Sequence, residues 1–284
     1  MLPNDVIESL PISIMGYQPV SGGDINSCYH VTTVADAYFL KVNDASVYPG
    51  MFEKEADGLA MLRANTPLKV PAVIACGTTS TNQYLLLEWI TGGTGTGESA
   101  AVFGAGMALL HQCTQPLFGY LSSNYIGSLH QKNQPVATWA VFYAQQRILP
   151  LVKIVFDQSA FGKSDLKAAD NCCNRLHTLI PVEPPALLHG DLWSGNYKTT
   201  TAGDTAIFDP AIYYGHREMD IAMTRLFGGF SPAFYDGYQQ VFPLQQGWEK
   251  RLPLMQLYPL LVHAILFGGH YISQCSDILR KWGG

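Results

Sequence analysis

The sequence has few charged residues and no block of basic ones. Of its 284 residues only 14% are Asp, Glu, Lys or Arg, and the formal net charge is −5. A nucleic-acid-binding surface normally carries a stripe of Lys and Arg, so we expect no nucleic acid partner. The apolar content of 48% excludes a disordered chain, and the length allows one large domain or two lobes.

Long apolar runs and targeting signals are also missing. The longest apolar stretch, residues 257–269, is interrupted by Pro259 and His263 and is too short to span a bilayer, so we expect no membrane partner. The first ten residues contain Pro3 and Glu8 where a signal peptide would have a basic start and an apolar core. These absences predict a cytoplasmic protein.

The six cysteines include no CxxC pair and have no histidine cluster beside them. Without a secretion signal, reduced and mostly buried thiols are expected. Cys28 is the exception to consider, because it follows a turn that contains glycines. If its thiol were partly exposed near bound phosphates, it could be sensitive to oxidation.

The pattern of secondary structure changes near residue 92. Before it, alternation predicts strands at residues 16–20, 28–34, 38–42, 72–76 and 84–90, and a helix at 52–62. After it, helical patterns dominate, at residues 101–113, 137–156, 164–179 and 254–268. We therefore predict an α+β fold with two lobes: a small, mostly-β lobe over residues 1–91 and a larger, mostly-α lobe over residues 92–284.

The most informative stretch is HGDLWSGN, residues 189–196, followed by Ile-Phe-Asp at 207–209. Asp191 precedes Asn196 by five positions, which is the spacing of a kinase catalytic loop. Asp209 ends a predicted strand, where kinases place their main metal ligand. We therefore predict Asp191 as the catalytic base and Asn196 and Asp209 as ligands of Mg²⁺, with ATP as phosphoryl donor. Each could alone be a turn residue, but their joint occurrence favours the kinase interpretation.

Two features of the first lobe fit a phosphate site. Lys41, in Phe-Leu-Lys-Val, is predicted to contact the α- and β-phosphates while Glu55 of the next helix holds it. Glu55 is preferred over Glu53 because it lies on the apolar face of that helix. Gly22 and Gly23 would let backbone amides approach the phosphates, although a glycine pair in a hairpin is a weak signal.

The end of the last strand of this lobe resembles a hinge. Glu88, Trp89 and Ile90 are predicted to meet the adenine through their backbone. The glycine-rich run at residues 92–97 follows, but it lacks the Gly-Lys-Ser/Thr ending of a Walker phosphate loop. A flexible connector between the lobes is the favoured interpretation of that run.

The sequence resembles the fructosamine kinase family, or ketosamine 3-kinases, which share the protein-kinase-like fold of aminoglycoside phosphotransferases and choline kinases. The resemblance covers nearly the whole chain. It rests on SGGDIN (21–26), FLKVN (39–43), NYIG (124–127) with Gln131 and Asn133, HGDLWSGN (189–196), GHREMDIAM (215–223) and LFGGF (226–230). Residues 209–211 read Asp-Pro-Ala where protein kinases have Asp-Phe-Gly, a departure expected in the small-molecule branch.

This resemblance implies ATP- and Mg²⁺-dependent phosphorylation of the 3-hydroxyl of a ketosamine, such as ribulosamine or fructosamine, either free or on protein lysines. Decomposition of the 3-phosphate then frees the amine, so the implied role is protein deglycation. Asp220 is implied to support the catalytic loop, and Glu218 to face the substrate. Trp193 is a candidate to stack on the sugar, with a core position as the alternative. His189 is expected to orient the loop.

Two other functions stay open at this point. The first is a related kinase that acts on an aminoglycoside, choline or a metabolic sugar. The second is a catalytically silent kinase fold that serves as a binding module. The presence of Lys41, Asp191, Asn196 and Asp209 together argues against the silent module.

Overall fold

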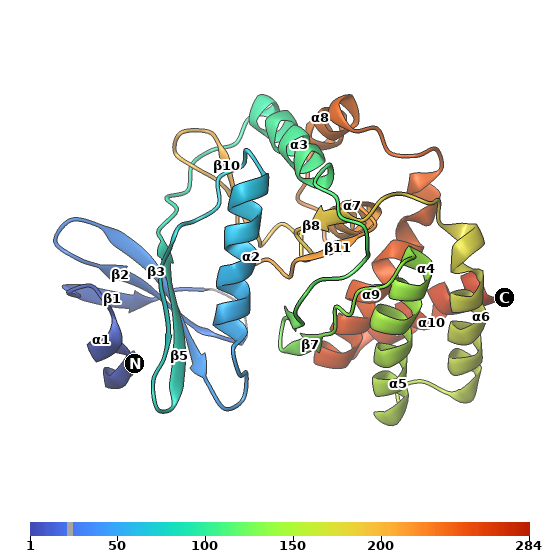
Figure 1. Ribbon diagram of the computed structural model, residues 1–284, viewed down its shortest axis with the longest axis horizontal. Coiled ribbons are helices and arrows are strands. Elements are labelled where there is room, and N and C mark those ends of the chain that lie inside the picture. The colour runs from blue at the N-terminus through green and yellow to red at the C-terminus, as the bar shows by residue number, and fades with distance from the viewer. Residues whose placement is uncertain (22–24) are drawn as a thin grey trace.

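An antiparallel five-stranded sheet forms the first lobe of the computed structural model, which describes residues 1–21 and 25–284 (Figure 1). In spatial order the strands are β1 (Gly16–Pro19), β2 (Ser27–Thr32), β3 (Ala37–Asp44), β5 (Asn82–Glu88) and β4 (Val73–Thr78). Gly22 and Gly23, predicted to approach phosphates, lie outside the described residues.

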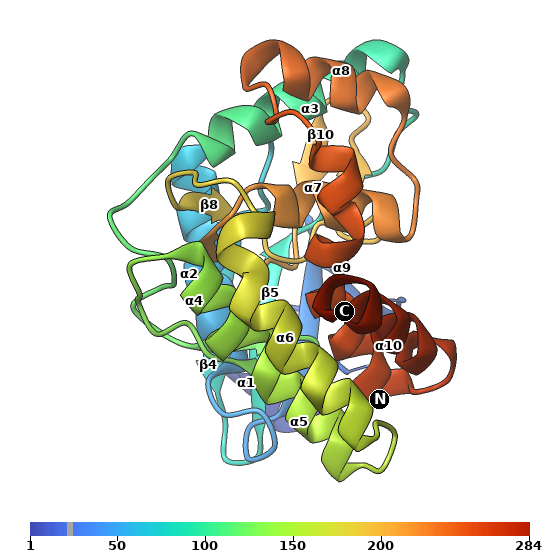
Figure 2. The same cartoon turned by 90° about the vertical axis from the view of Figure 1, so that its right-hand side faces the viewer.

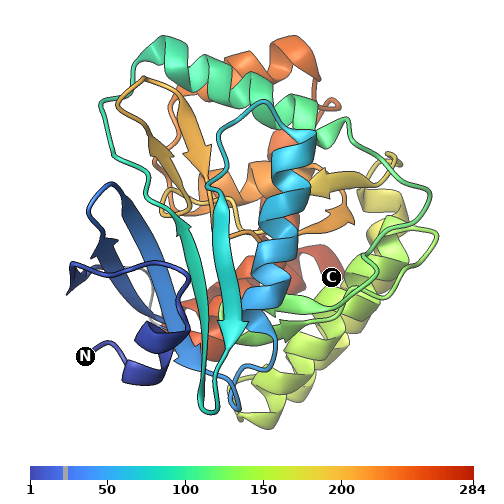
Figure 3. The same cartoon turned by 60° about the vertical axis from the view of Figure 1, so that its left-hand side comes forward.

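Two helices cover opposite faces of this sheet. The short α1 (Asn4–Ser9) covers the outer face, and α2 (Met51–Asn65) lies between the sheet and the second lobe (Figures 1 and 3). Side chains alternate along β3, so Leu40 faces α1 while Lys41 faces α2 and the second lobe. The alternation of the FLKV motif therefore determines that the lysine points into the space between the lobes.

The second lobe is mostly helical. Its longer helices are α3 (Gly97–His111), α5 (Leu149–Asp157), α6 (Lys163–Leu179), α7 (Glu218–Leu226), α8 (Pro232–Val241), α9 (Trp248–Phe267) and α10 (His270–Gly283). Figure 2 shows α5, α6, α9 and α10 packed together on the side of the second lobe that faces the viewer, away from the five-stranded sheet. They enclose the larger apolar core. A second core joins the lobes, since it contains Phe52 and Leu59 of α2 together with Phe103 of α3 and Phe234 of α8.

Short strands carry the loops between these helices. Strand β8 (Ala186–Leu188) pairs with β11 (Tyr213–Gly215), β9 (Tyr197–Thr199) with β10 (Thr205–Ile207), and β6 (Asn124–Ile126) with β7 (Leu129–Gln131). The HGDLWSGN loop connects β8 to β9, and the Asp-Pro-Ala segment connects β10 to β11. Gly190 is required where these loops touch: its φ is +84°, and a Cβ there would lie 2.1 Å from the Ala211 carbonyl oxygen.

The predicted α+β arrangement, with a β-rich first part and a helical second part, is confirmed. The predicted helix at 137–156 is divided into α4 (Trp139–Phe142), a π-helical turn (Tyr143–Ile148) and α5, which starts with Pro150 in its first turn. Proline lacks the amide proton that a continuous α-helix would need there.

The connector at residues 92–97 is held in place rather than loose. The Gly93 amide donates to the Thr199 carbonyl oxygen at 2.8 Å, and a Cβ on Gly93 would collide with the Thr200 carbonyl oxygen. Thr96 caps α3 by accepting from the Ser99 amide, so that helix begins earlier than predicted. Across the described ranges, no helix combines the length and the apolar character needed to cross a bilayer.

Candidate active site

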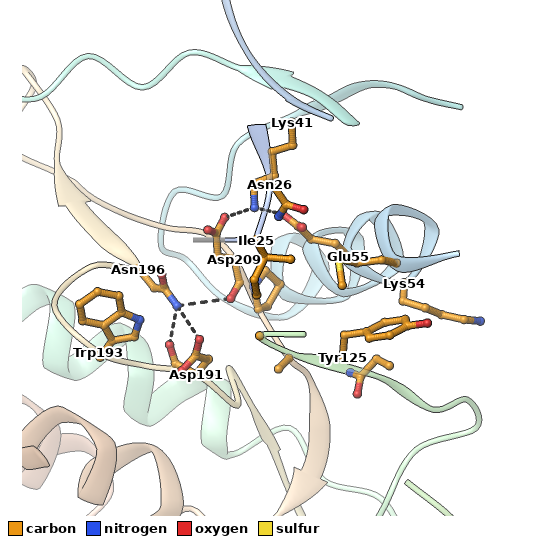
Figure 4. Close-up of a pocket in the computed structure, with 15 residues that line it drawn as sticks. Ile25, Asn26, Lys41, Lys54, Glu55, Tyr125, Asp191, Trp193, Asn196 and Asp209 are labelled. Carbon is orange, nitrogen blue, oxygen red and sulfur yellow. Dashed lines mark hydrogen bonds and ion pairs between the residues drawn. The ribbon is translucent and has the colours of Figure 1, made fainter. Parts of the chain in front are cut away.

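Three neighbouring cavities open between the lobes. The central cavity, about 190 Å³, is lined by Lys41 and Glu55 from the first lobe and by Asp191, Asn196 and Asp209 from the second (Figure 4). The hinge cavity, about 410 Å³, is lined in part by residues 88–90, and the outer cavity, about 390 Å³, has one wall formed by α9. All three share Trp193 as a wall.

Lys41 forms two ion pairs in the central cavity. Its Nζ lies 2.7 Å from Glu55 Oε1 and 2.6 Å from Asp209 Oδ1, and the residue is only 2% exposed. Burial alone would lower the pKa of Lys41, but the two carboxylates outweigh it and raise that pKa, so the lysine stays charged. The structure thus brings together the predicted phosphate-binding Lys41, its predicted partner Glu55 and the predicted metal ligand Asp209.

Asp191 and Asn196 are joined directly. Asn196 Nδ2 donates to the Asp191 backbone oxygen at 2.9 Å and to Asp191 Oδ2 at 3.0 Å. Burial raises the pKa of Asp191 to about 7; the hydrogen bond from Asn196 opposes this rise, and the charges of Asp209 and Asp220 add to it. A carboxylate with this pKa can accept a proton near neutral pH.

Asp209 adopts the left-handed backbone conformation, with φ of 57°. This conformation is uncommon for a residue other than glycine, although Asp tolerates it, and such strained positions are frequent at functional sites. It turns the Asp209 carboxylate toward Lys41 from the loop after β10.

The donor set of the central cavity fits Mg²⁺. The Nδ2 atom of Asn196 is used on Asp191, which leaves the Oδ1 atom of Asn196 as a ligand beside the Asp209 carboxylate. In the described part of the chain no three His, Cys, Asp or Glu side chains form a metal cluster. Mg²⁺ is commonly bound by one or two such oxygen ligands together with waters and phosphates.

A buried network fixes the backbone of the catalytic loop. Asp220, at the start of α7, accepts hydrogen bonds from the amides of His189 and Gly190 at 2.7 and 3.0 Å. His189 in turn donates from Nε2 to the Phe208 carbonyl oxygen, and its Nδ1 accepts from the Asp191 amide. This is the geometry expected of the predicted supporting pair, His189 and Asp220.

His111 also belongs to this network, although no sequence motif predicted it there. Its Nε2 lies 3.1 Å from Asp220 Oδ2, and its Nδ1 lies 2.7 Å from the hydroxyl of Tyr238. The residue was assigned only to a helical pattern, and the sequence contains no local signal for a partner that lies 109 positions away.

The hinge cavity has an apolar interior. Phe39, Leu87, Ile90 and Phe208 line it, together with Trp89, whose ring lies 5.6 Å from Lys198 Nζ. Two groups of Glu88 are engaged elsewhere. Its side-chain carboxylate binds Lys69 Nζ at 2.6 Å, and its backbone amide donates to the Ala72 carbonyl oxygen. Any contact of Glu88 with an adenine would therefore use its backbone carbonyl oxygen.

The outer cavity starts at Asp191 and extends along α9. Trp193, which is 38% exposed, packs edge-on against Phe227, whose ring lies 4.8 Å from that of His263. His263 donates from Nδ1 to the Pro259 carbonyl oxygen. Trp193 therefore lines this cavity and does not lie in a core, and His263, a residue of the predicted helix at 254–268, lines it as well.

The structure does not support the expectation for Glu218 or the exception considered for Cys28. Glu218 is fully buried and paired with Arg251, whose Nε lies 2.9 Å away, and it lines none of the three cavities described above. The structure thus places Glu218 away from the substrate side, because a buried carboxylate needs this cationic partner. Cys28 is also buried, and burial raises its pKa to about 11, which disfavours the reactive thiolate form.

The sequence pattern of the fructosamine kinase family matches residues 6–282. A protein of Enterococcus faecium named as a probable ketoamine kinase is 42% identical over 268 residues, covering 93% of this chain and 94% of the relative. The chloroplastic protein-ribulosamine 3-kinase of Oryza sativa subsp. japonica is 36% identical over 283 residues, covering 97% of this chain and 81% of the relative.

Solved structures agree with these sequence relatives. The crystal structure of a protein assigned as a fructosamine-3-kinase from Thermobifida fusca has a TM-score of 0.87 and 35% identity, covering 97% of this chain and 96% of that one. A thermostable mutant of aminoglycoside phosphotransferase APH(4)-Ia has a TM-score of 0.66 at 17% identity, covering 99% of both chains. The second likeness concerns the fold alone, and together they confirm the predicted two-lobed kinase fold.

Proposed function

The chain belongs to the fructosamine kinase family, and on this premise we propose that it transfers the γ-phosphoryl group of ATP to the 3-hydroxyl of a ketosamine. The observation that carries the proposal is the position of Asp191. It lines both the central cavity, which holds Lys41 and Asp209, and the outer cavity, which is large enough for a sugar adduct. A base at this junction can contact an acceptor hydroxyl on one side and a phosphoryl group on the other.

The residues of the central cavity are assigned the following roles. Asp191 orients the acceptor hydroxyl and takes its proton as the phosphoryl group is transferred. Lys41, freed from Asp209 when phosphates enter, pairs with the α- and β-phosphates while Glu55 keeps its ammonium in place. Asn196 and Asp209 would hold Mg²⁺, which when bound neutralises charge on the phosphates.

The adenine is assigned to the hinge cavity. Phe39, Leu87 and Phe208 provide apolar surface for a flat base, and the backbone at residues 88–90 provides polar groups at its edge. The contiguity of this cavity with the central cavity supports a single extended nucleotide site, since Trp193, Asn196 and Asp209 line both.

The acceptor is assigned to the outer cavity, and its charge argues for a ketosamine. Asp191 is the single acidic residue among the described residues that line it, and burial lowers the pKa of His263, so that histidine is neutral. A polycationic aminoglycoside would need several carboxylates to replace the water around its ammonium groups. An adduct with one amine and several hydroxyls fits the mixture of rings and polar groups better.

A glycated protein lysine is included among the proposed acceptors. The outer cavity is bordered by Phe267, which is 56% exposed, so an acceptor carried on a peptide can extend from it into solvent. We further propose a cytoplasmic location and a role in deglycation, and note that the rice relative is named as chloroplastic.

The decisive experiment measures ATP consumption with Mg²⁺ and a panel of ribulose-lysine, fructose-lysine, an aminoglycoside and choline. We expect turnover with the ketosamines, and NMR of the product should place the phosphate on the 3-oxygen. Turnover with the aminoglycoside or choline alone, or a phosphate on another oxygen, would overturn the proposed acceptor.

A further inference from the structure

Two asparagines are joined beside the central cavity. Asn43, two residues after Lys41 on β3, donates from Nδ2 to Asn26 Oδ1 at 2.7 Å. Asn43 is buried, only 8% exposed, and residues two apart on a strand face the same side, so it faces the same side of the sheet as Lys41. The bond thus connects the segment that follows the glycine pair at residues 22 and 23 to the strand that carries the lysine.

One neighbour of Asn43 bears on which way the two amides point. Asn43 Nδ2 also lies 3.3 Å from the sulfur of Met51, the first residue of α2. A thioether sulfur is a weak acceptor and cannot donate, so this neighbour favours the amide nitrogen of Asn43 over its oxygen. In this orientation Asn43 donates to Asn26 and Asn26 accepts through Oδ1, while Asn43 Oδ1 is buried and has no hydrogen-bond partner among the described residues.

This orientation directs the other end of the Asn26 amide. Asn26 lines the central cavity together with Lys41, Asp191 and Asp209 (Figure 4), but it is not among the residues that line the hinge cavity. Since its Oδ1 is engaged by Asn43, the two N–H groups on Nδ2 are the polar atoms left for a ligand in the central cavity.

We propose that Asn26 donates a side-chain hydrogen bond to the terminal phosphates of the bound nucleotide, and that Asn43 is the positioning residue that fixes its orientation. The inference rests on the proposed use of ATP and adds a phosphate contact that the sequence motifs did not assign. A neutral amide suits this place, because Lys41 already pairs with two carboxylates, and a second cation would compete for them. Hydrogen bonds from a neutral donor to an ionised phosphate oxygen are stronger than bonds between neutral groups.

Binding measurements can test this without any acceptor. Calorimetric titrations would compare Mg²⁺-ATP with adenosine, which reaches only the hinge cavity, for the wild type and for Asn26→Ala, Asn26→Asp and Asn43→Leu. We expect Asn26→Ala to weaken ATP binding about 10–100-fold and to leave adenosine binding unchanged. Asn26→Asp keeps an oxygen for Asn43 but replaces the donor with a negative charge, so its loss of ATP affinity should be larger.

The positioning role makes a separate prediction. Asn43→Leu should weaken ATP binding less than Asn26→Ala, and the double variant should bind ATP no more weakly than Asn26→Ala alone, because Asn43 acts only through Asn26. Ser27→Ala, at the exposed neighbouring position, is the matched control and should bind both ligands as the wild type does.

Two results would overturn the inference. One is an Asn26→Ala variant with wild-type ATP affinity. The other is an equal loss for ATP and adenosine, which would indicate a purely structural role. A wild-type protein that binds ATP but phosphorylates no ketosamine would instead refute the proposed acceptor, and the comparison of ATP with adenosine would still decide the role of Asn26.

Discussion

Asn196 donates its side-chain amide to Asp191 twice, at 2.9 Å to the backbone oxygen and at 3.0 Å to the carboxylate. One side chain thus orients the proposed base and, through its oxygen, offers a ligand to the proposed metal. The five-residue spacing of the motif has a physical meaning here, because it lets the loop fold back far enough for this contact.

The first prediction concerns Asp191. Asp191→Ala should lower turnover of a ketosamine by roughly 10²–10⁴-fold, because the acceptor hydroxyl loses its orienting base. The affinity for Mg²⁺-ATP should change little, since Asp191 is not assigned to the nucleotide. Steady-state kinetics and calorimetry check both statements. Asp204→Ala, at an exposed loop position, is the control, and near wild-type turnover in Asp191→Ala would remove Asp191 from the mechanism.

The second prediction concerns Asp209. Asp209→Ala should weaken binding of Mg²⁺-ATP as well as turnover, because the carboxylate contributes most of the protein's charge at the metal. Asp209→Asn is the matched variant: asparagine tolerates the left-handed backbone at φ 57° and keeps one oxygen ligand. We expect it to fold as the wild type does and to bind Mg²⁺-ATP with intermediate affinity. Calorimetric titration with unchanged affinity in both variants would place the metal elsewhere.

The third prediction concerns Lys41. From its sequence context alone, Lys41→Met should leave the ligand-free protein as stable as the wild type. The structure changes this expectation, because the substitution leaves Glu55 and Asp209 facing one another without their cation. The free energy of unfolding should fall by about 1–3 kcal/mol, less than for a fully buried pair because Asp209 is partly exposed.

Two measurements separate the roles of Lys41. Urea unfolding of the ligand-free variant reports the lost ion pairs. The shift of the unfolding midpoint on adding Mg²⁺-ATP should also become smaller, because weaker binding stabilises the folded state less. Full turnover in Lys41→Met would mean that the first lobe does not bind phosphates through this lysine.

Several relations within the central cavity have local determinants in the sequence, although the contact between Lys41 and Asp209 joins residues 168 positions apart. Alternation along β3 places Lys41 on the face toward α2, and the spacing within HGDLWSGN brings Asp191 to Asn196. Asp209 follows directly from the end of β10. Each of these relations depends on residues that are neighbours in one strand or one loop.

Other features depend on partners far along the chain. Glu218 was expected near the substrate, but its partner Arg251 is 33 positions later, and that pairing determines where its carboxylate lies. One wall of the outer cavity is formed by α9, whose side chains carry no motif. From the sequence alone, His263 is one residue of a predicted helix. Only the folded structure, which brings α9 beside the catalytic loop, shows that it borders a cavity.

The fourth prediction concerns pH. Burial lowers the pKa of His189, His216 and His263, so these rings are neutral in the folded protein near pH 7. The unfolded chain protonates histidine at about pH 6.5, so below that pH it binds more protons than the folded state. Stability should therefore fall as the pH is lowered through about 6.5. Urea midpoints between pH 7.5 and 5.5 check this.

One carboxylate opposes the histidines in the same window. Burial raises the pKa of Asp191 to about 7, so the folded protein takes up a proton there that the unfolded chain does not, but one such group is outnumbered by three histidines. The pKa values of Asp220 and Glu183 are both lowered: burial would raise them, but hydrogen bonds from His111 and Arg217 respectively outweigh it. Their contribution to stability is present above their unfolded pKa and is lost only below about pH 4. In the Asp191→Asn variant, which removes this opposing group, a urea midpoint that stays constant or rises between pH 7.5 and 5.5 would contradict the assignment of neutral buried histidines.

The fifth prediction concerns the acceptor. Phe267 borders the outer cavity and neither of the other two, so Phe267→Ser should raise the KM for a ketosamine about 3–10-fold through lost ring contact, with unchanged ATP affinity. Trp193→Ala should affect both substrates, because Trp193 lines all three cavities. Val182→Ser, at an exposed apolar position, is the control. If Phe267→Ser changed ATP affinity and left the acceptor KM unchanged, the acceptor would not occupy the cavity beside α9.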